Sequence, residues 1–399
     1  MDTLFKKASW NLGIVEYPDE LDQFAKEKYT GRLDPANIEN IRNLQESENI
    51  FGEYCDLVIE AAKQLQGESS AYLWAKVVSE YIYVSSCGKA RKVKIPEADG
   101  SLLRDMLPLL VMIPSMLEMR KIMEDRRFDD DRILENMKIF QNCLAATKSK
   151  IGRLAHDRHY FRWTMLFLKG LIFSMNGFKF EVKKLPESAV YLQNIVSKKI
   201  VPVMKIGAFH SSGAVLGSAG YEDAYGSFLA EFEERQDAFV GHPVENGAVL
   251  RETQAFFKDE WKVLAAPGDY ALGMHIPKGT DISKDAFDRA VEQAQGFMSE
   301  HYKEYAPVCL ICHSWLLDPT LSDILGKESR IVRFGERFTR IPVKSAGKEV
   351  FSFVFPPQIK SLDELPENTR LEKGLKSLYL GGGFIHGYEG IAPLKDEKF

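Results

Sequence analysis

Residues 263–343 read VLAAPGDYALGMHIPKGTDISKDAFDRAVEQAQGFMSEHYKEYAPVCLICHSWLLDPTLSDILGKESRIVRFGERFTRIPV, and this stretch decides the fold. Its pattern predicts a strand, a loop, a long helix, a second strand, a short helix and a further strand. The first strand leads into a polar HIPKG turn and the second into CHSWLLDP. In α/β sheets, ligands bind where strand ends open into loops and helix N-termini. These two strand ends are therefore the predicted functional site.

The first strand is predicted over residues 270–276, with Gly273 and His275 on the same face. A glycine inside a strand often marks the close approach of a ligand or of another backbone. Pro277 ends the pairing because it has no N–H. The next helix is predicted to begin after Ser283, a suitable N-cap. Its buried stripe is predicted to be Phe287, Val291, Ala294 and Met298.

The second strand, residues 308–315, is nearly continuous in apolar residues, which predicts burial on both of its faces. Asp318 and Pro319 are typical of the N-cap and first position of a helix. Ser329 is a suitable cap for a further helix. The apolar residues of that helix are Ile331, Phe334 and Phe338.

The segments APGDYALGMHIPKG, CHSWLLDPTLSDIL and SRIVRFGERF together resemble a bacterial family of GNAT-like N-acyltransferases. Members of that family combine a helical N-terminal domain with a GNAT-like C-terminal domain. The resemblance covers most of the chain and is concentrated in residues 240–343. It implies acyl transfer from acetyl-CoA or a longer acyl-CoA to an amine, and it leaves the acceptor and the acyl chain length open.

Ordinary GNAT enzymes hold the CoA pyrophosphate on an Arg/Gln-x-x-Gly-x-Gly/Ala loop at a helix N-terminus. The equivalent loop here is residues 277–282, which has one glycine, Gly279, and an aspartate, Asp281. Lys278, Gly279 and the helix N-terminus at Ser283 are the predicted phosphate contacts. Asp281 is expected to oppose a phosphate because both carry negative charge.

The resemblance also implies direct attack by a free amine, with the enzyme removing a proton. His275 is the predicted general base because an imidazole exchanges protons near neutral pH; the alternative is a structural hydrogen-bonding histidine in the turn. Backbone N–H groups from Met274 to Ile276 are the predicted donors to the carbonyl oxygen. Ser314 is predicted to hydrogen-bond a ligand carbonyl or a thiolate, with backbone capping as the alternative.

Cys309 and Cys312 form a C-x-x-C motif inside an apolar strand. A redox motif is expected at a helix N-terminus, and a zinc site needs further ligands, so neither function is favoured. His313 is predicted to lie on the face opposite Cys312 and Ser314, which argues against a Cys-His nucleophilic pair.

His156 and His159 have a spacing that places two histidines on one helical face. A metal site is one interpretation. A capped, solvated helix start explains the pattern better because no further ligand follows. We therefore predict no metal.

The composition is that of a globular protein. A length of 399 residues predicts two or three domains, and a net charge of −5 argues against broad nucleic-acid binding. Five cysteines suit a reducing compartment. The first ten residues lack a signal-peptide core, and the longest apolar run, residues 107–117, is too short to cross a bilayer. We therefore expect a cytoplasmic protein without a membrane segment.

Helical patterns dominate residues 1–176, and strand patterns begin at residue 177. Within the helical part we expect a buried aromatic-rich helix at residues 69–85 and a kinked core helix at 101–125. Later elements are expected as strands at 178–183, 189–195 and 200–209 in an antiparallel meander, a short helix at 226–236, a strand at 351–355 and a helix at 361–380. The glycine-rich residues 378–393 suit a flexible tail better than a phosphate-binding lid.

We therefore predict an α+β protein with a helical N-terminal domain, residues 1–150, and a GNAT-like mixed-sheet α/β domain, residues 151–399. The predicted function is acyl-CoA-dependent N-acyl transfer to a small amine acceptor. A catalytically silent ligand-binding or assembly protein of the same fold is the alternative, because the phosphate loop departs from the GNAT pattern. The sequence does not specify the oligomeric state.

Overall fold

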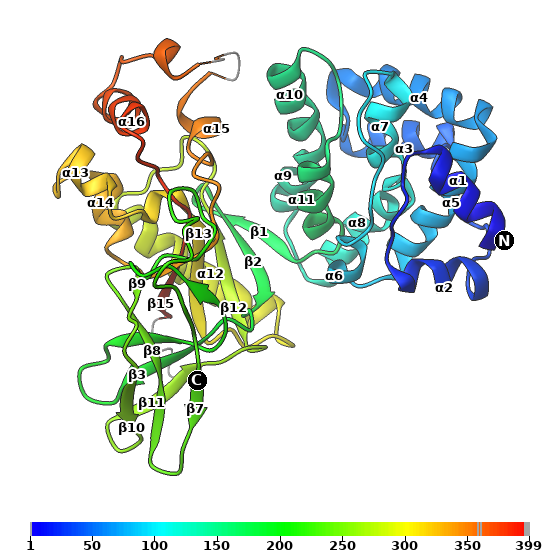
Figure 1. Cartoon of the computed structure of the whole chain (residues 1–399). Helices are drawn as coiled ribbons and strands as arrows, with labels where there is room; N and C mark the ends of the chain where they lie inside the picture. The colour runs from blue at the N-terminus through cyan, green and yellow to red at the C-terminus, as the bar shows by residue number, and fades with distance from the viewer. Residues whose placement is uncertain (1, 357–358, 360, 395–399) are drawn as a thin grey trace. The chain divides into compact units, whose positions relative to one another are not determined.

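The computed structural model of the chain describes residues 2–356, 359 and 361–394 (Figure 1). Its internal contacts divide the chain into two compact units, residues 1–173 and 174–399. The predicted fold class is confirmed, because helices are followed by a mixed-sheet α+β region. The domain boundary predicted at residue 150 stays a prediction. None of the described helices is long and apolar enough to span a membrane.

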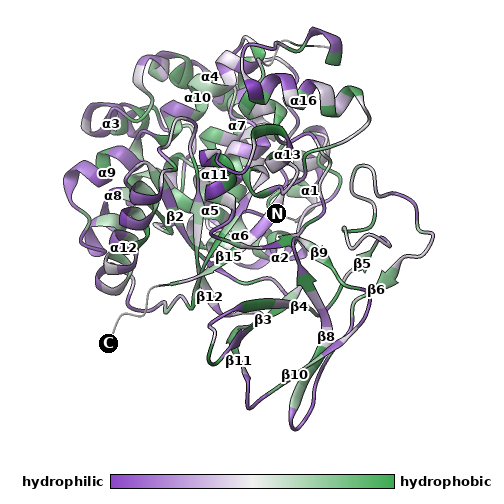
Figure 2. Cartoon of the chain, turned by 90° about the vertical axis from the view of Figure 1, so that its left-hand side faces the viewer, coloured by the Kyte–Doolittle hydropathy of each residue, from purple (hydrophilic) through white to green (hydrophobic). Residues whose placement is uncertain are grey.

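The first unit is helical, and its helices carry hydrophobic and hydrophilic residues along the same ribbon (Figure 2). Such helices bury one stripe of side chains and leave the other in water. The helices are α1 (Asp2–Asn11), α2 (Asp19–Glu27), α3 (Ile38–Glu48), α4 (Cys55–Gly67), α5 (Ser69–Val84), α6 (Cys87–Ala90), α7 (Leu102–Leu110), α8 (Ile113–Asp125), α9 (Asp130–Met137), α10 (Ile139–Ile151) and α11 (Arg158–Leu168), with a 3-10 turn, η1 (Gly52–Tyr54).

Of two predictions for helices in this unit, one is confirmed and one is corrected. The aromatic-rich helix is α5, which is buried along most of its length, as predicted. The kinked core helix is instead two helices, α7 and α8, which meet at Val111 and Met112. Pro114 lies in the first turn of α8, where its missing N–H breaks no intrahelical hydrogen bond.

The segment before α11 differs from its prediction at one residue. Asp157 caps α11 by accepting a hydrogen bond from the backbone N–H of Tyr160 at 2.9 Å, so the capped helix start is confirmed. His156 is not solvated as predicted, because its side chain is 1% exposed. Its backbone N–H donates to the Asp105 carbonyl, and neither ring nitrogen has a hydrogen-bond partner.

The second unit contains a six-stranded sheet in the order β1-β2-β12-β13-β15-β14. The pair β12 and β13 is parallel, whereas β2 with β12, β13 with β15, and β15 with β14 are antiparallel. The strands are β1 (Ile172–Met175), β2 (Phe178–Lys184), β12 (Tyr270–His275), β13 (Cys309–Ser314), β14 (Thr339–Pro342) and β15 (Tyr388–Pro393).

A seven-stranded sheet follows the path β10-β8-β4-β3-β11, with β7 and β9 paired to β8. Its strands are β3 (Ala189–Asn194), β4 (Ile200–Met204), β7 (Phe232–Glu234), β8 (Ala238–Glu245), β9 (Ala248–Val249), β10 (Gln254–Phe257) and β11 (Trp261–Ala265). A short pair, β5 (Ala208–Phe209) and β6 (Phe228–Leu229), lies apart from it. One buried cluster joins the two sheets: it includes Ala189 and Tyr191 of the second sheet and Ile311 and Ile391 of the first.

The remaining elements connect the strands. They are α12 (Lys284–His301), η2 (Trp315–Leu317), α13 (Leu321–Leu325), α14 (Arg330–Gly335), α15 (Phe351–Val354), η3 (Leu362–Glu364) and α16 (Arg370–Leu380). Ser283 caps α12 as predicted, accepting a hydrogen bond from the Ala286 N–H. Phe287 of α12 packs edge-on against Phe178 of β2. The helix α12 therefore covers the sheet face that carries Leu272 and Met274.

The predicted antiparallel meander is wrong in its first step. β2 pairs with β12, whereas β3 and β4 pair with each other in the second sheet. The chain leaves the first sheet at Leu185, whose N–H donates to the Asp269 carbonyl. Strand pairing over such sequence distances depends on tertiary packing, which local patterns do not contain.

Three further predictions are corrected. Residues 226–236 form β6 and β7 rather than a helix, because β7 finds β8 as a pairing partner. Residues 351–355 form α15 rather than a strand, since Phe351, Val354 and Phe355 share one buried cluster at helical spacing. Residues 378–393 are not a tail: they hold the end of α16 and all of β15, an interior strand of the six-stranded sheet.

Candidate active site

The parallel pair β12 and β13 opens at its carboxyl end. The two strands are paired from Leu272 with Leu310 through Met274 with Cys312, and the parallel pairing stops there. The following residues pair only outward: His275 with Lys179 of β2, and His313 with Glu389 of β15. The sheet therefore splits between His275 and His313, directly beside the loop that leads to α12.

Polar side chains gather on one face at this split. Gly273 pairs with Glu181 on one side and with Ile311 on the other, so these positions share a face with His275 and His313. The imidazole Nε2 of His275 lies 2.9 Å from Oε2 of Glu181. The Glu181 side chain is only 8% exposed, so its carboxylate is held in place and fixes the orientation of the ring.

His313 has a different environment from His275. Its side chain is solvent-exposed and makes no hydrogen bond within the described part of the chain. Glu389 lies opposite it on β15 and accepts a hydrogen bond from the Tyr191 hydroxyl at 3.0 Å. Desolvation, together with the nearby Lys183 and His275, lowers the pKa of His313, while Glu389 partly opposes this shift. The net downward shift favours the neutral form of the His313 ring.

The close approach predicted at Gly273 is made by a side chain of the protein. A Cβ at this position would come within 2.9 Å of Cδ of Lys183 and 3.4 Å of the Glu181 carbonyl oxygen. The aliphatic part of Lys183 thus crosses Gly273. Its positive charge contributes to the lowered pKa of His313.

The cysteines on β13 have no reactive character. Burial raises the pKa of both the Cys309 and the Cys312 thiol to about 12, and neither forms a disulfide. A thiolate is the nucleophilic form of cysteine, so both thiols are inert at neutral pH. Ser314 caps η2 by accepting a hydrogen bond from the Leu316 N–H at 3.1 Å. Its predicted contact with a ligand stays a prediction.

The predicted phosphate loop is folded around Asp281. The Asp281 carboxylate accepts hydrogen bonds from the Ser283 N–H at 2.9 Å and the Ser283 hydroxyl at 3.0 Å. These bonds to Ser283, with smaller effects of Arg330 and Arg289, lower its pKa. The aspartate therefore stays ionised at the N-terminus of α12, where the helix dipole favours an anion.

The other predicted contacts lie around the same turn. Gly279 has a φ of +88°, a conformation that favours glycine. The Pro277 carbonyl accepts a hydrogen bond from Thr280 and closes the turn. The backbone N–H groups of Lys284 and Asp285, in the first turn of α12, have no acceptor inside the helix.

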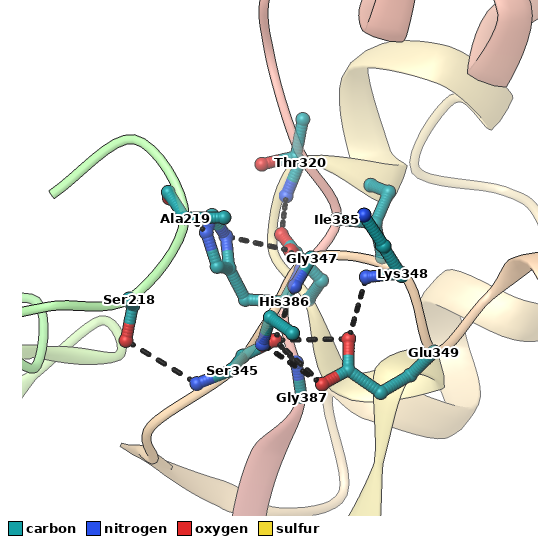
Figure 3. A network of polar contacts seen from close by, with 12 residues as sticks. Ser218, Ala219, Thr320, Ser345, Gly347, Lys348, Glu349, Ile385, His386 and Gly387 are labelled. Atoms are coloured by element: carbon teal, nitrogen blue, oxygen red, sulfur yellow. Dashed lines mark hydrogen bonds and ion pairs between the residues drawn. The ribbon is translucent and has the colours of Figure 1, made fainter. Parts of the chain in front are cut away.

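A separate polar network lies where β15 begins (Figure 3). The buried Asp318 accepts hydrogen bonds from the Thr320 N–H at 2.8 Å and the His386 N–H at 2.6 Å. The His386 Nε2 lies 2.9 Å from the Ala219 carbonyl oxygen and must therefore donate to it. Burial lowers the pKa of His386, but Asp318 and Ala219 outweigh it, so the net shift is upward.

This network holds the chain beside the split between β12 and β13. His386 donates to the Ala219 carbonyl through Nε2, and its Nδ1 lies 3.8 Å from Oδ2 of Asp318. Glu349 in the same network accepts hydrogen bonds from Ser345, Ala346 and Lys348. The network fixes the segment that precedes Gly387, which lies against the ring of His313.

Sequence patterns singled out His275 but did not point to its partner Glu181, or to His313 and Glu389 across the split. The two glutamates look like the outer residues of half-buried strands. His313 was placed correctly on the face opposite Cys312 and Ser314, but only the pairing register shows that His275 shares that face. A histidine at the end of each parallel strand was the available signal. Within the described residues, no group of three or more potential metal ligands occurs.

Comparison with known proteins identifies the fold. Residues 150–392 match the model of a family described as GNAT-like C-terminal domain. A solved acyltransferase in complex with decanoyl-CoA and teicoplanin has 16% identity and a TM-score of 0.65, covering 98% of this chain and 99% of its own. A mutant acyltransferase in complex with octanoyl-CoA has 16% identity and a TM-score of 0.66, covering 99% of this chain and 100% of its own.

A third structure, an acyltransferase in complex with decanoyl-CoA, has 15% identity and a TM-score of 0.66, covering 98% of this chain and 99% of its own. No curated protein matches the chain. A parallel strand pair that splits beside a capped crossover helix defines a GNAT-like fold. The chain belongs to the GNAT-like C-terminal domain family, which confirms the resemblance seen in its sequence.

Proposed function

We propose that this protein transfers an acyl group from acyl-CoA to the amino group of a small-molecule acceptor, with His275 as the general base. The observation that carries the proposal is the split between β12 and β13 with the His275–Glu181 pair on its edge. Acyl-CoA complexes of structures with the same fold support the donor, and decanoyl and octanoyl chains favour a medium-chain acyl group.

In this proposal the CoA pantetheine passes through the split, and the thioester faces the side that carries His275. Lys278, Gly279 and the α12 N-terminus at Ser283 contact the pyrophosphate. A backbone N–H of Met274 or Ile276 donates to the thioester oxygen as negative charge develops there. Ser314, at the end of β13, would donate its hydroxyl hydrogen to the ligand carbonyl or to the thiolate while its oxygen caps η2.

The acceptor approaches from the opposite direction to the phosphate loop. Its nitrogen attacks the thioester carbonyl, and His275 takes the proton that the nitrogen must lose. Glu181 stabilises the imidazolium that forms, as a carboxylate does wherever it orients a histidine that acts as a base. The teicoplanin complex of one structural neighbour favours a non-protein acceptor, including one larger than a simple amine.

The first experiment is calorimetric titration of the full chain with CoA, acetyl-CoA and decanoyl-CoA. Saturable binding with a Kd near ~1 µM, equivalent to about −8 kcal/mol, is expected for decanoyl-CoA. Release of free CoA thiol is then followed with a panel of amines that includes phenethylamine and O-benzylhydroxylamine. Absence of binding by all three CoA compounds would exclude the proposed function.

Asp281 favours a second candidate, an acyl-CoA-binding protein without turnover. Its carboxylate accepts the hydrogen bonds of Ser283 in the loop that corresponds to the phosphate-binding loop of ordinary GNAT enzymes. Under this alternative, decanoyl-CoA binds but no amine in the panel causes thiol release, and His275 variants change nothing. The enzyme proposal instead requires thiol release with at least one amine and a loss of this activity in the His275 variants.

Replacing Asp281 by Asn is expected to strengthen CoA binding about threefold, because it removes one negative charge beside the helix N-terminus. The amide oxygen can still accept the hydrogen bond from the Ser283 N–H, so the turn is retained. Calorimetry at low and high salt measures the change, which should shrink as salt screens the charge. Asp259→Asn is the matched control, because it removes the same charge from the exposed turn between β10 and β11. Weaker binding by Asp281→Asn would mean that the carboxylate supports the site.

A further inference from the structure

Two histidines occupy matching positions on either side of the split. Gly273 and Ile311 are paired, and His275 and His313 each lie two residues further along the same face. Each histidine has a buried glutamate on its neighbouring outer strand, Glu181 or Glu389. Paired strands lie about 5 Å apart, so the two rings flank the same opening directly beyond the last pair, Met274 with Cys312.

The proposed reaction has two protons to remove from its acceptor. An alkyl amine in water is an ammonium at neutral pH, as a lysine side chain with a pKa of ~10 is. One proton must leave before the nitrogen has a lone pair to attack with. The second leaves the nitrogen after the bond to the carbonyl carbon has formed. A single base cannot hold both protons at once.

The surroundings of His275 suit a proton that is kept and later returned, whereas those of His313 suit a proton that is released to water. The ring of His275 is held by Glu181 at 2.9 Å, which stabilises a proton that is stored and then returned. His313 is exposed to solvent and makes no hydrogen bond within the described residues, so it can pass a proton to water. The charged groups that face it are Lys183 on β2, His275 on β12, Glu349 in the loop before α15 and Glu389 on β15.

We propose that His313 is a second catalytic base, which accepts the first proton from the bound ammonium form of the acceptor, while His275 accepts the second. This inference rests on the proposed function and specifies its acceptor class as an alkyl ammonium. Partial desolvation of the ring and the nearby Lys183 lower the pKa of His313 and favour its neutral form, while part of the side chain stays open to solvent.

The steps balance as follows. The ammonium gives one proton to His313, which releases it to water, and the free lone pair forms the N–C bond while the carbonyl pair moves to oxygen. His275 takes the second proton from nitrogen. The C–S bond then breaks with its electron pair on sulfur, the carbonyl reforms, and His275 protonates the thiolate. Ammonium and thioester thus become amide, free CoA and one released proton.

The test compares two acceptors of similar shape, phenethylamine and O-benzylhydroxylamine, with decanoyl-CoA as donor. The first is an ammonium at pH 7, whereas the second is mostly unprotonated. The variant His313→Gln is expected to lose about tenfold or more in kcat/KM for phenethylamine at pH 7, and little for O-benzylhydroxylamine. Its kcat/KM for phenethylamine should then rise about tenfold per pH unit toward the pKa of the amine, near ~10, unlike that of the wild-type protein.

Two further variants serve as controls for the His313→Gln result. His275→Gln should lose activity with both acceptors at every pH, because the second proton is the same for both. His159→Gln, an exposed histidine of the helical unit, should leave both activities unchanged. An equal loss with both acceptors in His313→Gln would assign His313 a structural role and overturn the proposal, as would a wild-type pH profile in this variant.

A second readout needs no acceptor. In the full chain labelled at histidine, the NMR titration of His313 is expected to show a neutral ring at pH 7, and Glu389→Gln should lower its pKa further. A protonated His313 at pH 7 would overturn the proposal even if neither amine is acylated. Failure of decanoyl-CoA to bind would instead remove the proposed function itself, so the two failures are distinguishable.

Discussion

His275→Gln is expected to lower kcat for acyl transfer by about 10²- to 10⁴-fold, the usual contribution of a positioned general base. The glutamine amide nitrogen can occupy nearly the position of Nε2 and keep a hydrogen bond to Glu181, which lies 2.9 Å from the ring in the native chain. The variant therefore retains the fold and loses only the ability to accept a proton. Release of CoA thiol measures the rate.

The affinity for decanoyl-CoA should stay within about threefold of the native value in this variant, because the donor is held by the loop and helix that begin after residue 276. Glu181→Gln should show a smaller loss of kcat, because it removes the charge that stabilises the imidazolium but leaves the base in place. A His275→Gln protein that binds decanoyl-CoA and turns over at the native rate would rule out His275 as the base. The turn histidine would then have the structural role that its sequence also allowed.

The second large effect is on stability in acid, and it comes from His156. Burial lowers the pKa of this side chain from 6.5 to about 4, and neither ring nitrogen has a hydrogen-bond partner. Between these two values the unfolded chain binds a proton that the folded chain excludes. Stability therefore falls as pH drops from about 6.5 to about 4, by about 3 kcal/mol in total for this residue.

Denaturant unfolding followed by far-ultraviolet circular dichroism, repeated across this pH range, measures the effect. His156→Leu fills a similar space without polar atoms, so it should remove this part of the pH dependence. It should also be at least as stable as the native chain at pH 7, because two unpaired buried nitrogens are lost. His159→Leu, at an exposed position three residues away, should keep the native pH dependence. An unchanged acid slope in His156→Leu would contradict the assignment.

The helices and strands of residues 263–343 could be predicted because local physical rules specify them. Ser283 is an N-cap whose oxygen accepts a backbone hydrogen bond, and the apolar residues 309–312 are buried in β13. The errors fall where local patterns allow two structures. In residues 351–355 the apolar side chains fit both the spacing of a strand and that of a helix. Packing against Leu375 and Tyr379 of α16 selected the helix.

The sequence by itself determined the class of fold, and it predicted the two strand ends as the site with His275 as the base at their edge. It did so because capping, alternation and strand ends are properties of a few neighbouring residues. Only the tertiary structure decided that Glu181 supports His275, that Lys183 crosses Gly273, and that Asp281 takes the helix N-terminus. It alone placed His313 and Glu389 beside them, because the pairing register of strands more than thirty residues apart is set by packing of the whole domain.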